Sequence, residues 1–259
     1  MKKNLMLFWL FSVNSLKTTL QHPVGVVLFT LTKFVRVGLY FLFVYFLLSR
    51  TKVMGEYTLN EALIFFLTYN LIDTLGQFLF REVYRFRQLI ISGDFDTVLV
   101  KPYHPFLRVL VGGIDLSDLV TIIPYALILG YFMSKLSSSP FELLLFFILF
   151  INGMLLMTTF YIIVLALGIL TTEVDHVTMI FRDISRMASI PITIYTEPIR
   201  SLLMFVIPIG IMMTVPVEAL LGLLSVPMII ISFGISIGGF IFSLILWNKA
   251  LMQYQSAGS

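Results

Sequence analysis

Eight ionisable residues stand inside stretches of the sequence that are otherwise apolar, and their charge makes them the first candidates for a functional site. Four are basic and four are acidic: Lys33, Arg36, Arg182, Arg186, Asp73, Asp115, Asp118 and Asp183. A charge at the centre of a lipid bilayer costs at least ~2.5–3.5 kcal/mol, so such residues are usually paired or functional. The equal numbers of each sign favour ion pairs between helices. A second interpretation stays open, in which some of these side chains line a gate or a translocation route.

The sequence offers little to a metal or a covalent intermediate. It has no cysteine and only three scattered histidines, which excludes thiolate chemistry and argues against a zinc site. Asp94 and Asp96 form a lone acidic pair, which is too little for a metal site. We therefore expect no catalytic residue, no cofactor and no metal in this chain.

Composition indicates which kind of protein carries these charges. Apolar residues make up 59% of the 259 residues and charged residues 12%, whereas average soluble domains have about 45–50% and about 25%. So few charges could not cover the apolar surface of a soluble fold. This excludes a soluble enzyme, a disordered chain and a nucleic-acid-binding protein. What remains is an all-α polytopic membrane protein that contacts membrane lipids.

The first residues predict a helix that lies on the membrane surface. In residues 1–22 apolar positions alternate with lysines and Asn14, and Trp9 and Lys17 are suited to anchor an amphipathic helix in the interface. Pro23 then ends or kinks the helix. The alternative is a simple helical extension of the first span.

Six transmembrane helices are expected in a single domain over residues 1–259, because a span needs about 20 apolar residues. The ranges are 24–48, 59–80, 108–133, 141–167, 172–192 and 226–247, with a polar connecting region at 81–107. In this interpretation residues 193–221 form a re-entrant hairpin. The alternative makes 171–200 a cytoplasmic loop and 201–221 the fifth span. The prolines of this part are Pro191, Pro198, Pro208 and Pro216, and their spacing fits a broken hairpin better than one straight helix.

Basic residues outside the spans set the orientation. Nine lie on the side of the two termini: Lys2, Lys3, Lys17, Arg81, Arg85, Arg87, Lys101, Arg108 and Lys249. Four lie on the other side: Arg50, Lys52, Lys135 and Arg200. Cytoplasmic loops are enriched in lysine and arginine, so both termini and the 81–107 region are predicted to be cytoplasmic, with the hairpin extracellular.

Four segments, in order along nearly the whole chain, resemble those of type-2 ABC exporter permeases, and within them a six-span family long described as of unknown function. They are 55–64 at the entry to the second span; 91–102, with Gly93-Asp94 and a Leu-x-Lys-Pro ending; 190–195 with Pro208; and 247–258, with a Trp, a Tyr and Ser-Ala-Gly. One departure is Lys101, where arginine is commoner in the family.

The resemblance implies a permease subunit of an ATP-driven exporter in a bacterial or archaeal plasma membrane. The chain has no glycine-rich phosphate loop of its own, so ATP and Mg would be bound by a separate ATP-binding subunit, in two copies, beside a second permease chain, identical or related. The substrate implied is an amphipathic or lipid-like compound, a drug or a peptide. Alternatives from other classes are a secondary transporter or channel and, less favoured, a membrane-embedded lipid-modifying enzyme.

The resemblance also assigns a coupling helix to residues 81–107. The residues expected to face the ATPase are Arg81, Arg85, Arg87, Gly93, Asp94, Asp96, Lys101 and Pro102. Asp94 is expected to cap a short helix over 95–100. The contact between two permeases is placed on the first and fifth spans, where the cations of the fifth, Arg182 and Arg186, would find partners.

Overall fold

The computed structural model describes residues 2–21, 23–50, 57–111, 113, 116–171 and 174–255. Every regular element in these ranges is helical. Four of the described helices are long and apolar enough to cross a membrane: α2 (Pro23–Arg50), α3 (Leu59–Leu79), α8 (Pro140–Thr171) and α13 (Val226–Gln253). A fifth apolar helix, α7 (Leu116–Met133), is shorter. The chain is therefore a multi-pass, all-α membrane protein.

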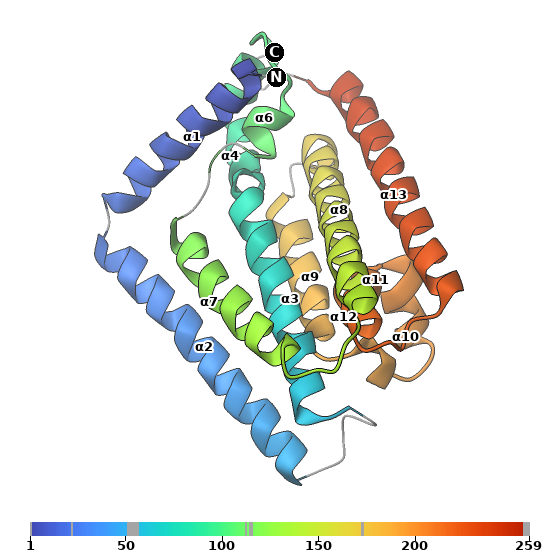
Figure 1. Ribbon diagram of the computed structural model, residues 1–259. Coiled ribbons are helices and arrows are strands. Elements are labelled where there is room, and N and C mark those ends of the chain that lie inside the picture. The colour runs from blue at the N-terminus through green and yellow to red at the C-terminus, as the bar shows by residue number, and fades with distance from the viewer. Residues whose placement is uncertain are drawn as a thin grey trace.

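The first two helices stand to one side of the bundle. Helix α1 (Lys2–Leu20) ends before Pro23, where α2 begins in a new direction (Figure 1). Proline lacks the backbone N–H that would continue the preceding helix. The helix break expected at His22-Pro23 is thus present. Most described side chains of α2 are exposed on the surface of this chain.

Helix α8 forms the centre of the bundle. It is apolar on all sides, which is typical of a helix surrounded by others. It packs against α13 along its length and against two short helices, α11 (Ile209–Met213) and α12 (Val215–Leu220). Helix α3 is also mostly buried and packs on α7, and its first turn is fixed by a capping box between Thr58 and Glu61.

Four short helices lie at the end of the bundle that carries the first and last described residues, which we call the termini end (Figure 1). They are η1 (Arg81–Arg85), α4 (Phe86–Ile91), α5 (Asp94–Leu99) and α6 (Phe106–Val109). The third expected span, 108–133, does not begin as one helix: α6 ends at Val109 and α7 begins at Leu116. Two glycines, 112 and 113, fall between them in the sequence, and glycine is a poor helix former.

The fifth expected span, 172–192, is also shorter than predicted. Helix α9 (Val174–Arg186) has 13 residues and continues only in a short 3₁₀ turn, η2 (Met187–Ser189). Thirteen residues extend about 20 Å, less than the ~30 Å of a bilayer's apolar core. Charged residues follow each other closely here, so α9 is amphipathic rather than apolar. Its buried face carries Val174, Thr178, Phe181 and Ser185.

The hairpin segment, residues 193–221, occupies the opposite end of the bundle, the hairpin end (Figure 1). It begins within the turn η3 (Ile192–Ile194) and contains α10 (Ile199–Ser201), a π-helical turn η4 (Leu202–Val206), α11 and α12. The plain-hydropathy alternative requires one straight helix over residues 201–221. The structure has no such helix, because the helix breaks at Ile207-Pro208. A side chain on Gly153 of α8 would lie 2.4 Å from the Met212 carbonyl oxygen, so this glycine allows α11 to approach.

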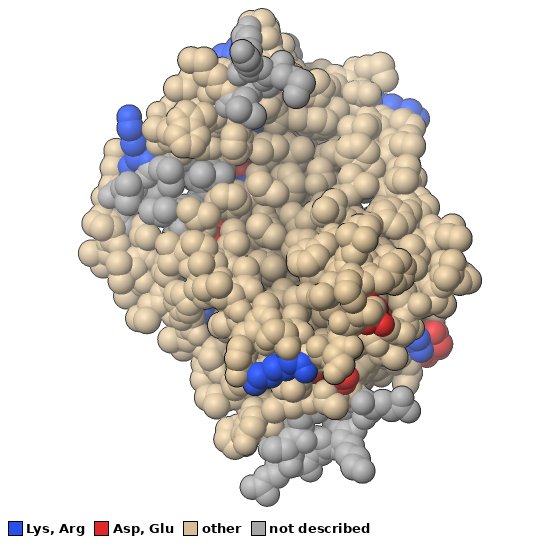
Figure 2. Space-filling view, viewed as in Figure 1, with Lys and Arg blue, Asp and Glu red and all other residues tan. Residues whose placement is uncertain are grey.

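Charge is distributed as a membrane protein requires. Figure 2 shows a broad uncharged area across the middle of the face in view, with lysine, arginine, aspartate and glutamate side chains mainly toward the two ends. Hydrocarbon against the middle of this face would thus meet mainly apolar side chains.

Candidate functional site: the coupling region and an intramembrane charge cluster

An aromatic cluster holds residues 81–107, the coupling region, against the end of α13. Phe86 of α4 and Phe95 of α5 are fully buried and meet edge to face at 5.1 Å between ring centroids. Trp247 of α13 is also buried and lies 4.8 Å from the ring of Phe106 on α6. Tyr254, just after α13, packs on Phe95 at 5.1 Å. Three short helices thus share one core with the last long helix.

A buried carboxylate ties the same region to α1. Glu82 of η1 is buried and forms ion pairs with Arg85, at 2.9 Å, and with Arg108 of α6. The Arg108 guanidinium also lies over the ring of Phe11 in α1, 5.6 Å from its centroid. A buried charge must be paired to be tolerated, and here two arginines pair with the one buried carboxylate. The coupling region is therefore fixed to the N-terminal helix as well.

Two further contacts reach α8 and α9. The Phe86 ring lies 3.4 Å from where a side chain on Gly168 of α8 would begin. Arg87 forms an ion pair with Asp175 of α9 at 3.3 Å, between side chains that are both about half exposed. The coupling region thus contacts α1, α8, α9 and α13.

The turn between α4 and α5 depends on Gly93. Its φ of 76° is in the left-handed region, where glycine has no steric penalty. The expected cap at Asp94 is wrong: Gly93 occupies the N-cap position and Asp94 is the first residue of α5. The Asp94 carboxylate instead accepts a hydrogen bond from the Ser92 hydroxyl at 2.7 Å. Its charge still lies at the N-terminus of the short helix.

No part of the chain that the structure describes covers the outer face of the coupling region. Ile91 and Val100 are apolar and 58% and 84% exposed, although they lie at the end of the molecule rather than on its membrane-facing sides. The other exposed residues of this face include Arg85, Arg87, Asp94, Thr97, Lys101 and Pro102, whereas Arg81 and Asp96 are half-buried. Exposed apolar side chains among charges are typical of a surface that contacts another protein.

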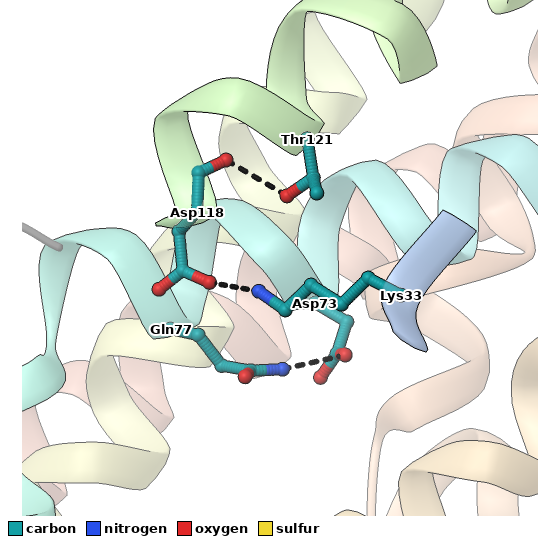
Figure 3. Close-up of polar contacts among 5 residues, drawn as sticks. All are labelled: Lys33, Asp73, Gln77, Asp118 and Thr121. Carbon is teal, nitrogen blue, oxygen red and sulfur yellow. Dashed lines mark hydrogen bonds and ion pairs between the residues drawn. The ribbon is translucent and has the colours of Figure 1, made fainter. Parts of the chain in front are cut away.

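Within the bundle, three of the predicted intramembrane charges come together (Figure 3). Lys33 reaches from α2 to form an ion pair with Asp118 of α7, whose side chain is fully buried. Asp73 of α3 lies beside this pair, and its carboxylate accepts a hydrogen bond from Gln77 at 2.8 Å. The Thr121 hydroxyl donates to the Asp118 carbonyl at 2.9 Å. Helices α2, α3 and α7 thus meet at charged and polar groups.

The same polar layer continues toward α9. The hydroxyls of Tyr84 in η1 and Tyr161 in α8 are 3.1 Å apart. Asp73 and Arg182 both lie within electrostatic range of this tyrosine pair. On the exposed face of α9, Asp183 and Arg186 pair with each other at 2.9 Å.

Arg186 also lines a cavity of about 180 Å³ beside α2 and α3. Tyr40 of α2 stacks on Phe66 of α3 in this cavity, with centroids 3.9 Å apart, and donates a hydrogen bond to the Ser189 hydroxyl at 3.1 Å. The cavity therefore lies where the first span meets the segment after α9.

The remaining predicted residues are placed as follows. Asp115 and the side chain of Arg36 lie outside the described part of the chain. Pro191 and Pro216 are buried, Pro208 is half-buried at the break before α11, and Pro198 is exposed and follows a cis peptide bond.

Sequence reasoning missed Glu82 and Glu218. Both are buried carboxylates in short helices that hydropathy does not separate from loops. The only sequence signal for a buried ion pair at Glu82 is that arginines stand close to it in the chain, Arg81 before it and Arg85 after it.

One sequence pattern is excluded as a site by its context. Residues 234–238 read Gly-Ile-Ser-Ile-Gly, which matches the G-x-S-x-G pattern of serine hydrolases. That pattern works when the serine sits on a sharp strand-to-helix turn. Ser236 instead lies inside the continuous helix α13, fully buried, and donates to the Ser232 carbonyl at 2.8 Å.

Long apolar helices, a clustered polar layer inside them and a compact helical region at one end define a multi-pass membrane protein of the transporter class. Residues 34–258 match the family described as ABC-2 family transporter protein, and the chain belongs to that family. Members are membrane-embedded permease subunits of ABC transporters, are not themselves enzymes, and typically pair with an ATP-binding subunit. No curated protein and no solved structure matches the chain.

Proposed function

We propose that this chain is the permease of an ATP-driven exporter, which moves an amphipathic compound out of the cytoplasm by alternating access. Such a compound is lipid-like, a drug or a peptide. The observation that carries the proposal is the coupling region, because its inner face is fixed to α1, α8, α9 and α13 while its outer face is uncovered. A separate ATPase that pushes on this face would move four elements at once.

The proposed topology has six crossings with both termini in the cytoplasm. The four long helices and α7 supply five of the crossings. The remaining crossing, between α8 and α13 in the chain, is α9 with η2, and it requires a thinned or water-filled path because α9 is short. The hairpin segment then re-enters from the outside without crossing. Buried residues 209–220, packed on α8, support this arrangement, since irregular backbone at membrane depth must be covered by protein.

A second permease, identical or related, would cover α2 and the exposed face of α9, and two ATPases would complete the transporter. Helix α2 leaves large apolar side chains exposed along its length. Beside this surface, the Asp183–Arg186 pair is more than half exposed, and a charged pair facing lipid would be costly. A protein partner or a shared aqueous path between two permeases would remove that cost.

Reconstitution tests the proposal. The purified permease should be inert alone and should stimulate, and be required for, ATP-dependent export when vesicles also contain the ATPase with which it co-purifies. Val100→Glu should abolish assembly with the ATPase, because it places a charge on the exposed apolar contact. Ser137→Glu, at the exposed turn before α8, is the matched control. Equal assembly and transport by the two variants would refute the coupling assignment.

Charge changes separate the roles of the arginines. Reversal at Arg85 and Arg87 should also impair coupling, but it breaks the pairs with Glu82 and Asp175, so Val100 gives the cleaner result. Alanine at Arg182 or Arg186 should weaken the complex more than Lys135→Ala. Lys135 lies over the Tyr131 ring at an exposed turn.

Single introduced cysteines test the topology cleanly because the chain has none of its own. A cysteine at Val100 should react only from the cytoplasm, and one at Ser137 only from outside. Both side chains are exposed, whereas Phe95 is buried and unsuitable. A cysteine at Glu197 decides the hairpin: labelling from outside supports the re-entrant arrangement, and labelling from the cytoplasm contradicts it.

A further inference from the structure

A cavity at the hairpin end is a feature that the coupling mechanism leaves unused. It has a volume of about 460 Å³ and lies between the hairpin segment, the start of α13 and the residues before α3. Its lining combines apolar side chains, among them Met204, Phe205 and Met228, with polar ones, among them Tyr57, Thr193, Glu197, Arg200 and Glu218. Its volume is within the roughly 300–1,000 Å³ typical of small-molecule sites, and it has more polar groups than most such sites.

Glu218 is the buried polar group of this cavity. It lies in α12 with 9% of its surface exposed, and its side chain lines the cavity. Among the described residues its carboxylate accepts no hydrogen bond and forms no ion pair, although Arg200 is near enough to act on it electrostatically. Its carboxylate oxygens are not among the enclosed polar atoms that lack a partner, so they face the cavity. Glu82 at the other end of the molecule, in contrast, is bound by two arginines.

The neighbouring charges leave this carboxylate uncompensated. Glu197 is already engaged, since it accepts hydrogen bonds from the Ser201 hydroxyl at 2.6 Å and from its backbone N–H at 3.2 Å. Arg200 is exposed. The two glutamates and one arginine give the cavity a net charge of −1 when all are ionised.

The chemistry of the wall selects the kind of cation. Within the described residues no three metal-ligating side chains gather, and Arg200 would repel a divalent ion. An ammonium group has three N–H donors. Glu218 offers a charged acceptor, and the hydroxyls of Tyr57 and Thr193, 3.1 Å apart, offer neutral ones. The flexible side chains of Met204 and Met228 can adapt to the apolar part of the same molecule.

We propose that this cavity binds the ammonium group of an amphipathic amine, with Glu218 as its anionic partner and Met204, Phe205 and Met228 against its apolar body. The inference deepens the proposed function, on which it rests, by assigning a class of transported compound to the outer end of the permease. The ammonium can belong to a free amphipathic amine or to the headgroup of phosphatidylethanolamine. The cavity recognises the chemistry that both share.

Direct binding to the purified permease in lipid nanodiscs, without ATPase, tests the site. The probe is dansylcadaverine, a primary amine on a fluorescent apolar group, and the controls are its N-acetyl derivative and a dansylated carboxylate. Wild type should bind the amine more tightly than either control probe. Glu218→Gln keeps the shape and removes the charge, and should weaken amine binding about tenfold or more. Arg200→Gln removes a competing cation and should tighten it severalfold.

These variants should fold. Glu218→Gln replaces an unpaired buried charge with a neutral group, and Arg200 is exposed, so neither should lower the thermal midpoint. Loss of amine binding with an unchanged midpoint supports the proposal. The proposal is overturned if the amine and its acetyl derivative bind equally, if Glu218→Gln binds as well as wild type, or if the carboxylate probe binds best and depends on Arg200.

Lipid composition identifies the source of the ammonium. Nanodiscs of phosphatidylglycerol alone are compared with nanodiscs that also contain phosphatidylethanolamine. Competition by phosphatidylethanolamine assigns the site to a lipid headgroup, and unchanged probe affinity assigns it to a free amine. Because no ATPase is present, failure to bind overturns the site alone, whereas absence of ATP-dependent export with intact binding would overturn the exporter function instead.

Discussion

The two ends of this permease manage buried charge in opposite ways. At the termini end, Glu82 is buried and bound by two arginines, and the surrounding rings pack edge to face. At the hairpin end, Glu218 is buried beside a cavity and no described side chain pairs with it. A satisfied network makes a region rigid, whereas an unsatisfied buried group leaves free energy available to a ligand. The contrast separates an end suited to receive force from an end suited to bind and release.

Backbone regularity follows the same division. In the coupling region α4 and α5 are joined at Gly93, a glycine in the left-handed region, and the short helices share the aromatic cluster. The hairpin segment breaks repeatedly, with a π-helical turn before Pro208 and two short helices after it. Such π-helical turns are frequent at functional sites.

The largest effect is expected at Phe95, where the rigid end can be loosened. Phe95→Ala removes a fully buried ring from the cluster with Phe86 and Trp247, and should cost about 3–5 kcal/mol of stability. The thermal midpoint in detergent should fall, and ATPase binding should no longer drive transport. Val100→Ala is the control, since that side chain is 84% exposed and its loss should leave the midpoint unchanged. Equal midpoints for the two variants would mean that the cluster does not hold the coupling region.

A smaller loss is expected at Glu82. Glu82→Ala leaves Arg85 and Arg108 without their shared partner, but both arginines are partly exposed and can be hydrated. The cost should therefore be about 2–3 kcal/mol, below that of a fully buried pair. Proteolysis within α1 should become faster because α1 loses its link through Arg108. An unchanged rate together with an unchanged midpoint would contradict the anchoring role.

Part of this contrast could be predicted from the sequence. Val83, Phe86 and Ile90 follow a helical apolar stripe, and all three are buried. Composition predicted the all-helical membrane protein, which is confirmed, and the resemblance predicted the ABC-2 family, also confirmed. These properties depend on local pattern and on short motifs, which a single sequence displays.

Long-range pairing could not be predicted. Equal numbers of acidic and basic residues indicate that ion pairs form, yet nothing in the spacing selects Asp118, 85 positions away, as the partner of Lys33. The partners of the coupling region on α13 are equally distant in the chain. The break before α7 and the short extent of α9 were missed because hydropathy averages over a window of residues. Such an average marks neither the glycines at 112 and 113 nor the residue at which a helix ends.

The packing of the hairpin segment gives a third test. Gly153→Ala places a methyl group against the Met212 carbonyl, so α11 must shift, at a cost of about 1–2 kcal/mol. Gly130→Ala is the matched control in another apolar helix. Its new methyl group meets nothing within 4 Å, and it should stabilise by about 0.5–1 kcal/mol. Changes of opposite sign in the thermal midpoints of the two variants would confirm the close approach. A loss of stability in both would contradict it, because the loss at Gly153 would then not be specific to the Met212 contact.

The smallest effect is expected from pH at the hairpin end. Helix α12 lies outside the proposed spans, and burial raises the pKa of the Glu218 carboxyl above its usual 4.5, with Arg200 opposing the shift. Glu197, Glu61 and Tyr57 are the other titratable groups near this cavity. A carboxyl with a raised pKa in the folded state contributes stability that is complete below 4.5 and is lost as pH rises through the raised pKa.

The ligand-free permease should therefore gain thermal stability as pH is lowered toward 5, and Glu218→Gln should remove most of that gain. Amine binding has the opposite dependence, because the ammonium needs the ionised carboxylate, so affinity should fall over the same range. Two titrations of wild type and Glu218→Gln, one of thermal midpoint and one of dansylcadaverine affinity, measure both dependences. If the wild-type and variant midpoints follow the same curve, the buried carboxylate is compensated by a group of its own chain, and the contrast between the two ends is lost.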